Sequence, residues 1–126
     1  MRNTALLLAM SALLAGCATE PFSYLDGRRY FQAELNSTNA TVISVDGKHY
    51  LQNPVRIEPG RHTIVLQAPP VAGFRYGEQR TLDLDVEPCK RYYFAAIRPN
   101  SISQDWTPRV DYVEAIGGCG VAIAGR

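Results

Sequence analysis

The sequence has very little lysine and no cluster of basic residues. Lys48 and Lys90 are the only lysines, and 13 basic side chains face 12 acidic ones over 126 residues. Nucleic-acid binding requires a basic patch that neutralises phosphates, so the composition argues against that class of function. A second long apolar segment, an internal repeat and a low-complexity run are also missing. We therefore expect one ordinary globular domain.

Histidine and the common catalytic motifs are equally scarce. His49 and His62 are the only histidines, and no third ligand accompanies them, so we expect no metal site and no cofactor. A Gly-x-Ser-x-Gly nucleophile motif is absent. Asp83, Asp85 and Glu87 alternate as on a solvent-exposed strand face, a spacing foreign to calcium-binding loops. These observations predict a protein that is not an enzyme.

A short apolar run near the start ends in Leu14-Ala15-Gly16-Cys17. The run spans residues 5–15, too few for the roughly twenty residues that cross a bilayer. The four residues resemble the lipobox of bacterial lipoprotein precursors, in which the signal peptide is removed before a cysteine that then carries lipid. The resemblance implies a helical signal peptide over residues 1–16 and a lipid anchor on Cys17. Ordinary secretion with Cys17 unmodified is the alternative.

The residue after Cys17 is alanine. In the enterobacterial sorting pattern an aspartate there retains a lipoprotein in the inner membrane, so the resemblance implies the outer membrane and its periplasmic face, with the inner membrane as the alternative. Removing residues 1–16 leaves 110 residues with 12 basic and 12 acidic side chains. We expect residues 17–27 to form the lipidated cysteine and a short tether, and residues 28–126 to form the domain.

Two cysteines, Cys89 and Cys119, remain once Cys17 is assigned to lipid. Two cysteines in an oxidising compartment most simply form a disulfide. A redox pair is usually spaced Cys-x-x-Cys, and a structural zinc site needs four ligands, so both alternatives are disfavoured. The glycines around Cys119 allow the backbone to bend toward Cys89. We predict a structural disulfide.

The rest of the chain has the patterns of short strands. Leu82, Leu84 and Val86 alternate with acidic residues, Asp46-Gly47 is a strong hairpin signal, and no sustained helical period occurs after the signal segment. We expect strands in residues 30–35, 40–45, 48–51, 54–58, 61–67, 81–87, 90–97 and 110–116. Residues 117–126 form either a terminal strap held by the disulfide or, at 121–123, a further strand on this domain or a neighbour. The pattern predicts an all-β fold, an antiparallel β-sandwich of about seven short strands, with a small barrel as the alternative.

Residues 41–67 resemble a PEGA-type module, a small β domain named for a Pro-Glu-Gly-Ala motif. The likeness is carried by Val45-Asp46-Gly47, by Pro54-Val55, and by the run Glu58-Pro59-Gly60-Arg61-His62-Thr63-Ile64. The chain departs from the pattern in having Glu-Pro-Gly-Arg at the second turn. The resemblance implies a β-sandwich in an envelope setting, no catalytic residues, and a His62 that bonds turn backbone. Residues 89–119 resemble small uncharacterised bacterial lipoproteins more weakly.

Aromatic residues supply the candidate binding surface. Tyr92, Tyr93 and Phe94 are consecutive, so alternation places Tyr93 on the face opposite its two neighbours, where it is a candidate contact for a partner. Trp106 lies in a loop between prolines and either plugs the end of the core or binds sugar or protein.

We therefore expect a non-enzymatic outer-membrane lipoprotein. It would present a disulfide-stapled β domain in the periplasm, as an accessory or interaction factor for an envelope protein. The alternative is a module that binds cell-wall glycan or another envelope carbohydrate.

Overall fold

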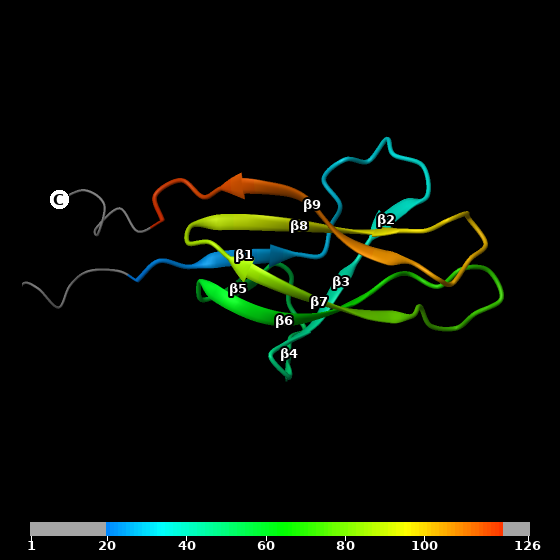
Figure 1. Ribbon diagram of the computed structural model, residues 1–126, viewed down its shortest axis with the longest axis horizontal. Coiled ribbons are helices and arrows are strands. Elements are labelled where there is room, and N and C mark those ends of the chain that lie inside the picture. The colour runs from blue at the N-terminus through cyan, green and yellow to red at the C-terminus, as the bar shows by residue number, and fades with distance from the viewer. Residues whose placement is uncertain (1–19, 120–126) are drawn as a thin grey trace, which may run out of the picture.

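The computed structural model describes residues 20–119 and consists of two packed β-sheets (Figure 1). The nine strands of this part of the chain are β1 (Ser23–Asp26), β2 (Ser37–Asn39), β3 (Thr41–Val45), β4 (Lys48–His49), β5 (Val55–Ile57), β6 (Gly60–Gln67), β7 (Gln79–Val86), β8 (Lys90–Ile97) and β9 (Thr107–Ala115). The predicted all-β sandwich is confirmed. No helix in residues 20–119 is long and apolar enough to cross a membrane. The predictions for residues 1–16, Cys17 and residues 121–123 lie outside the described residues.

One sheet is built around β8, and the other has the order β4-β3-β6-β7. β9 pairs with β8 along its whole length, from Lys90 to Ile97. β1 and β2 pair with opposite ends of β8, so they lie end to end along its other side, and β5 pairs with β1. The central position of β8 explains why its sequence is nearly continuously apolar.

β1 pairs with β8 in parallel, so this sheet is mixed, and the prediction of a purely antiparallel sandwich is wrong in this detail. β1 also falls within residues 17–27, which were expected to be tether. Leu25 is fully buried, and the two strands that pair with β1, β5 and β8, come much later in the sequence. Four residues carry too little pattern to reveal a strand whose partners are distant in sequence.

The stretch 30–35, expected to be a strand, is instead part of the loop between β1 and β2. The strand forms later, at Ser37–Asn39, in residues that favour turns. Asn36 has a φ of 59°, and after this left-handed residue the chain pairs with the end of β8. The tertiary pairing overrides the local preference of Ser37 and Asn39 for turns.

The core lies between the two sheets, and its largest fully buried side chains are Phe94, Leu25, Ile64 and Leu66. Trp106 belongs to it, with 3% of its surface exposed, and its indole N–H donates to the Glu78 carbonyl at 2.9 Å. The binding interpretation of Trp106 is therefore wrong, and the interpretation as a core plug is confirmed. A tryptophan whose one polar atom is satisfied by backbone can be buried at little cost.

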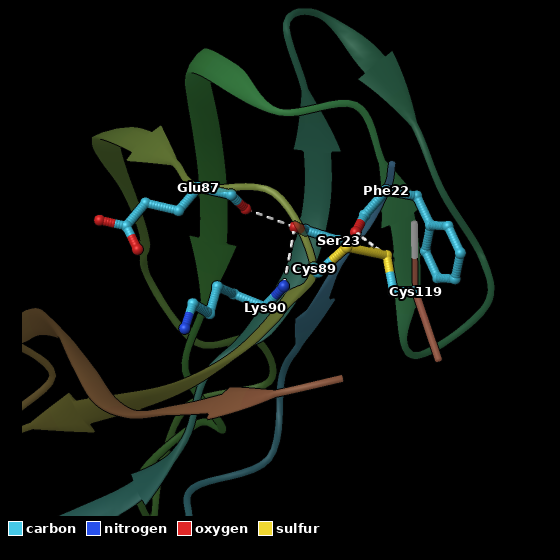
Figure 2. Close-up of a disulfide and its surroundings, with 6 residues drawn as sticks. All are labelled: Phe22, Ser23, Glu87, Cys89, Lys90 and Cys119. Atoms are coloured by element: carbon cyan, nitrogen blue, oxygen red, sulfur yellow. Dashed lines mark hydrogen bonds between the residues drawn. A yellow bond between two sulfur atoms is a disulfide. The ribbon is translucent and has the colours of Figure 1, made fainter. Parts of the chain in front are cut away.

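The Cys89–Cys119 disulfide is present and closes one end of the sandwich (Figure 2). The Cys89 amide donates to the Phe22 carbonyl at 2.9 Å, and the Cys89 carbonyl accepts from the Ile116 amide at 2.9 Å. The Ser23 hydroxyl donates to the Glu87 carbonyl at 2.5 Å and accepts from the Lys90 amide at 3.1 Å. The start of β1, the β7–β8 turn and the end of β9 are thus held together.

Loss of this disulfide is expected to lower the free energy of unfolding by about 3–4 kcal/mol, because the bridge closes a 30-residue separation in the unfolded chain. Chemical denaturation of the Cys119→Ser variant measures the loss. Thiol labelling mapped by mass spectrometry should find neither Cys89 nor Cys119 free in the untreated protein. Labelling of either one after unfolding without a reductant would refute the bridge.

Candidate functional site

Four aromatic side chains meet on the outer face of the β8–β9 pair. We call Tyr30, Phe31, Tyr93 and Tyr112 the aromatic cluster. Tyr30 stacks on Tyr112 with 4.1 Å between ring centroids, and its edge meets Tyr93 at 5.3 Å. Phe31 contacts both Tyr30 and Tyr112 edge-on. Tyr30, Phe31 and Tyr112 remain 45%, 51% and 39% exposed, although their rings contact one another.

Strand register and a β-bulge create the cluster. Tyr93 of β8 lies directly opposite Tyr112 of β9, so both rings project from the same face of the sheet. The register shifts between Tyr93 and Phe94, which pair with Tyr112 and Val110, and Asp111 is the extra residue. A bulge re-aims the side chain that it carries. Here it makes the Asp111 carboxylate available to the loop between β1 and β2.

Asp111 anchors that loop over β9. One carboxylate oxygen accepts the backbone amides of Tyr30 at 2.7 Å and Phe31 at 2.8 Å, and the other accepts from Arg109 at 2.6 Å. The Asp111 side chain is fully buried, and burial alone would raise its pKa. The hydrogen bonds from Phe31, Arg109 and Tyr30 outweigh burial and hold the pKa of Asp111 below its usual value. The carboxylate is therefore charged and fixes the two exposed rings.

Replacing Asp111 with alanine is expected to cost about 2–3 kcal/mol of unfolding free energy and to release Tyr30 and Phe31, because two backbone amides lose a charged acceptor. Limited proteolysis should then cleave the chain within residues 27–36. Asp105→Ala is the matched control: this exposed aspartate pairs with Arg80 on the surface, so its loss should change stability by less than about 1 kcal/mol. Equal behaviour of the two variants would contradict the assigned role.

Charged groups surround Tyr93. Its hydroxyl donates to Glu114 at 2.8 Å, and the Arg91 guanidinium lies 5.4 Å from its ring centroid. Burial, followed by the hydrogen bond to Glu114, raises the pKa of Tyr93. Arg91 is itself bonded to the buried Asp26 carboxylate. Tyr93 is thus held as a neutral phenol in a fixed position.

The same mixture of rings and arginines continues along β1 and β5. Arg56 lies over the Phe22 ring at 3.8 Å, Phe22 meets Tyr24 edge-on at 5.4 Å, and Arg91 approaches Tyr24 at 5.9 Å. Tyrosine and arginine are the side chains most enriched in protein interfaces. This sheet face therefore has the composition of a contact surface, with the aromatic cluster toward its β9 edge.

His62 lies outside the aromatic cluster, on β6, where its ring contacts the turn of the β3–β4 hairpin. Asp46 and Gly47 adopt φ values of 51° and 83°, as the predicted hairpin turn requires. The two ring nitrogens of His62 contact the Asp46 carboxylate at 2.6 Å and the Glu58 carbonyl at 2.7 Å. The predicted bond from His62 to turn backbone is therefore confirmed. No group of three or more metal-ligating side chains occurs within residues 20–119.

Because both His62 partners are acceptors, only the imidazolium satisfies both. Burial opposes this charge, but the hydrogen bonds to Asp46 and Glu58 outweigh it and raise the pKa of His62. A raised folded-state pKa gives a stabilisation that is complete below about pH 6.5 and is lost as the pH rises through the folded-state value.

The free energy of unfolding, measured by chemical denaturation, should therefore be lower at about pH 8 than at about pH 6, by at most about 1 kcal/mol. The His62→Gln variant should lack this part of the pH dependence. His49→Gln, at an exposed residue of β4 that takes no part in these two hydrogen bonds, should retain it. A His62→Gln variant with the full wild-type pH dependence would contradict the assignment.

The sequence therefore predicted one member of the aromatic cluster, Tyr93, and missed the other three. Tyr112 lies in a predicted strand, but one neighbour is the buried Asp111 and the other is Val113, which is 40% exposed, so the sequence pattern did not mark the exposed face. Tyr30 and Phe31 reach the site only through Asp111, for which no local pattern exists. Comparison of the chain with protein-family models, curated proteins and solved structures finds no match.

Proposed function

We propose that this chain is a non-enzymatic envelope lipoprotein, anchored through Cys17 in the outer membrane and facing the periplasm, that binds an envelope protein through the aromatic cluster. The observation that carries the proposal is the set of partly exposed rings fixed by one buried carboxylate. A surface that is already ordered before binding loses little conformational entropy in the complex.

The packing of the rings favours a protein partner over a carbohydrate. Tyr30 stacks on Tyr112, and Phe31 and Tyr93 each form a T-shaped contact with Tyr30. Ring faces that would otherwise stack on a sugar are partly used within the cluster. Rigid tyrosine clusters flanked by arginine are typical of protein-binding hot spots.

The distance between the proposed anchor and the sandwich is short. β1 begins at Ser23, six residues after Cys17, which corresponds to at most about 20 Å of extended chain. This is shorter than the tether expected from the sequence, because residues 23–26 belong to the sheet. The disulfide fastens the same end of the sandwich (Figure 2). A tether entering there would keep the binding face close to the membrane surface.

Binding of cell-wall glycan is the second candidate, supported by the exposed tyrosines and the arginines beside them. Retention of the full chain on isolated peptidoglycan sacculi distinguishes the two. Protein binding predicts no retention for the wild type or for Tyr112→Ala. Retention that is lost in Tyr112→Ala and kept in Tyr76→Ala, an exposed tyrosine outside the cluster, would replace the protein partner with a glycan.

A further inference from the structure

A pocket lies at the end of the sandwich opposite the disulfide. The loops after β6 and β8 meet there beside β2 (Figure 1). The pocket between them has a volume of about 310 Å³, and its lining includes Ser37, Thr38, Pro69, Pro70, Val71 and Arg98. It shares no residue with the aromatic cluster.

Arg98 is buried in this pocket without an acidic partner. Only 6% of the residue is exposed, and its guanidinium donates to the Ser103 carbonyl at 2.8 Å and to the Pro69 carbonyl. Within residues 20–119 no carboxylate forms an ion pair with it, whereas Arg91 pairs with Asp26 and Arg109 with Asp111. Neutral carbonyls do not cancel a full charge, and buried arginines normally have a counter-ion.

Two hydroxyl-bearing residues of β2, Ser37 and Thr38, are in the lining of the same pocket, and their hydroxyls also lack partners. Ser37 Oγ and Thr38 Oγ1 are both buried, and neither forms a hydrogen bond within the described part of the chain. Buried polar groups are nearly always satisfied, so each exception requires an explanation. Ser37 and Thr38 are consecutive in β2, so only one hydroxyl, that of Thr38, shares the face of Arg98. An uncompensated cation and an unsatisfied hydroxyl on the same side of one pocket share a single explanation, a bound oxyanion.

We propose that this pocket binds a ligand through one carboxylate group. The guanidinium is a planar fork of donors suited to a carboxylate. Thr38 pairs with Ala96, two residues before Arg98, so the Thr38 hydroxyl is on the same face as Arg98 and can donate to the same carboxylate. Pro69, Pro70 and Val71 offer apolar contact to a short side chain next to it. The pocket is at the small end of the range for ligand sites and contains one cation, so it suits a monoanion rather than a phosphate dianion. The carboxylate belongs either to a peptide C-terminus or to a free small acid.

The proposal is tested by titrating the full chain with N-acetyl-L-alanine, with its uncharged amide, and with inorganic phosphate, while backbone amide shifts are followed by NMR. The acid should cause saturable shifts at Thr38 and Val71, with at least about tenfold higher affinity than the amide. Equal shifts with acid and amide, or stronger binding of phosphate, would overturn the proposal. Tetra-alanine binding more tightly than N-acetyl-alanine would assign a peptide C-terminus, and equal binding would assign a small acid.

Variants test the same site. Arg98→Gln should abolish the acid-dependent shifts, while Arg75→Gln, an exposed arginine that is not part of this pocket, should keep them. Thr38→Val removes one hydroxyl with little change in shape and should weaken binding several-fold. Arg98→Gln could fail to fold, because the guanidinium also links the loops after β6 and β8. In that case Thr38→Val tests whether the pocket binds the acid. Wild-type affinity in folded Arg98→Gln or in Thr38→Val would refute the site.

Discussion

Replacing Cys17 with serine is expected to move the protein from the membrane fraction to the soluble periplasmic fraction. Each buried acyl CH₂ contributes about 0.8 kcal/mol to membrane binding, and two or three chains make attachment effectively permanent. The signal segment alone is too short to span a bilayer. Under the proposed lipid anchor, membrane attachment of the mature protein therefore depends on the lipid. Fractionation of cells followed by immunodetection measures the change.

Two further variants show whether the change in fractionation is caused by loss of the lipid. A version that begins at Ala18 behind a cleavable secretory signal should also be soluble, which separates loss of lipid from a failure to remove the original signal. Cys119→Ser should stay in the membrane fraction, because it removes only the disulfide. Continued membrane fractionation of the version that begins at Ala18 would defeat the lipobox assignment.

The second large effect is expected at Asp26, whose replacement by alanine should lower the free energy of unfolding by about 3–5 kcal/mol. Its fully buried carboxylate accepts hydrogen bonds from Arg28, from Asn53 at 3.0 Å and from Arg91. Removing the acid leaves Arg91, half-buried on the outer face of the sheet, without its ion-pair partner. The loss is measured by denaturant unfolding, with Asp26→Asn as the isosteric control that should lose less.

The same residue makes the fold sensitive to acid. Burial would raise the pKa of Asp26, but the hydrogen bonds from Arg28, Asn53 and Arg91 outweigh it and hold the pKa well below the usual range. A depressed folded-state pKa gives a stabilisation that is complete above about pH 4 and is lost as the pH falls further. Asp26→Ala should therefore lose less stability than the wild type between about pH 4 and pH 2. An identical pH dependence of the two proteins would contradict this role.

Local patterns were sufficient for much of the sandwich. The alternation of Leu82, Leu84 and Val86 placed β7 correctly. In a strand with one face in water, every second side chain faces the core and is apolar. The Asp46-Gly47 turn was predicted because few residues tolerate the required backbone conformation. The disulfide was predicted because only Cys89 and Cys119 remain to pair when Cys17 is assigned to the lipid.

The features that escaped prediction depend on contacts between distant residues. β1 is a strand because β5 and β8 supply partners on either side, and its own four residues alternate too briefly to signal this. The aromatic cluster exists because a bulge at Asp111 turns a carboxylate toward the amides of Tyr30 and Phe31. Trp106 could be placed either in the core or on the surface, because a backbone acceptor for its indole is visible only in the folded chain.

Site-specific photocross-linking in intact cells tests the central claim most directly. A photoreactive phenylalanine at position 112 lies within the aromatic cluster, and the same residue at position 76 is equally aromatic and lies outside it. We predict a discrete adduct between this protein and one envelope protein from position 112, absent from position 76 and lost when Asp111→Ala is added. No protein adduct from position 112, or the same adduct from both positions, would contradict the assignment of the cluster as the partner-binding surface.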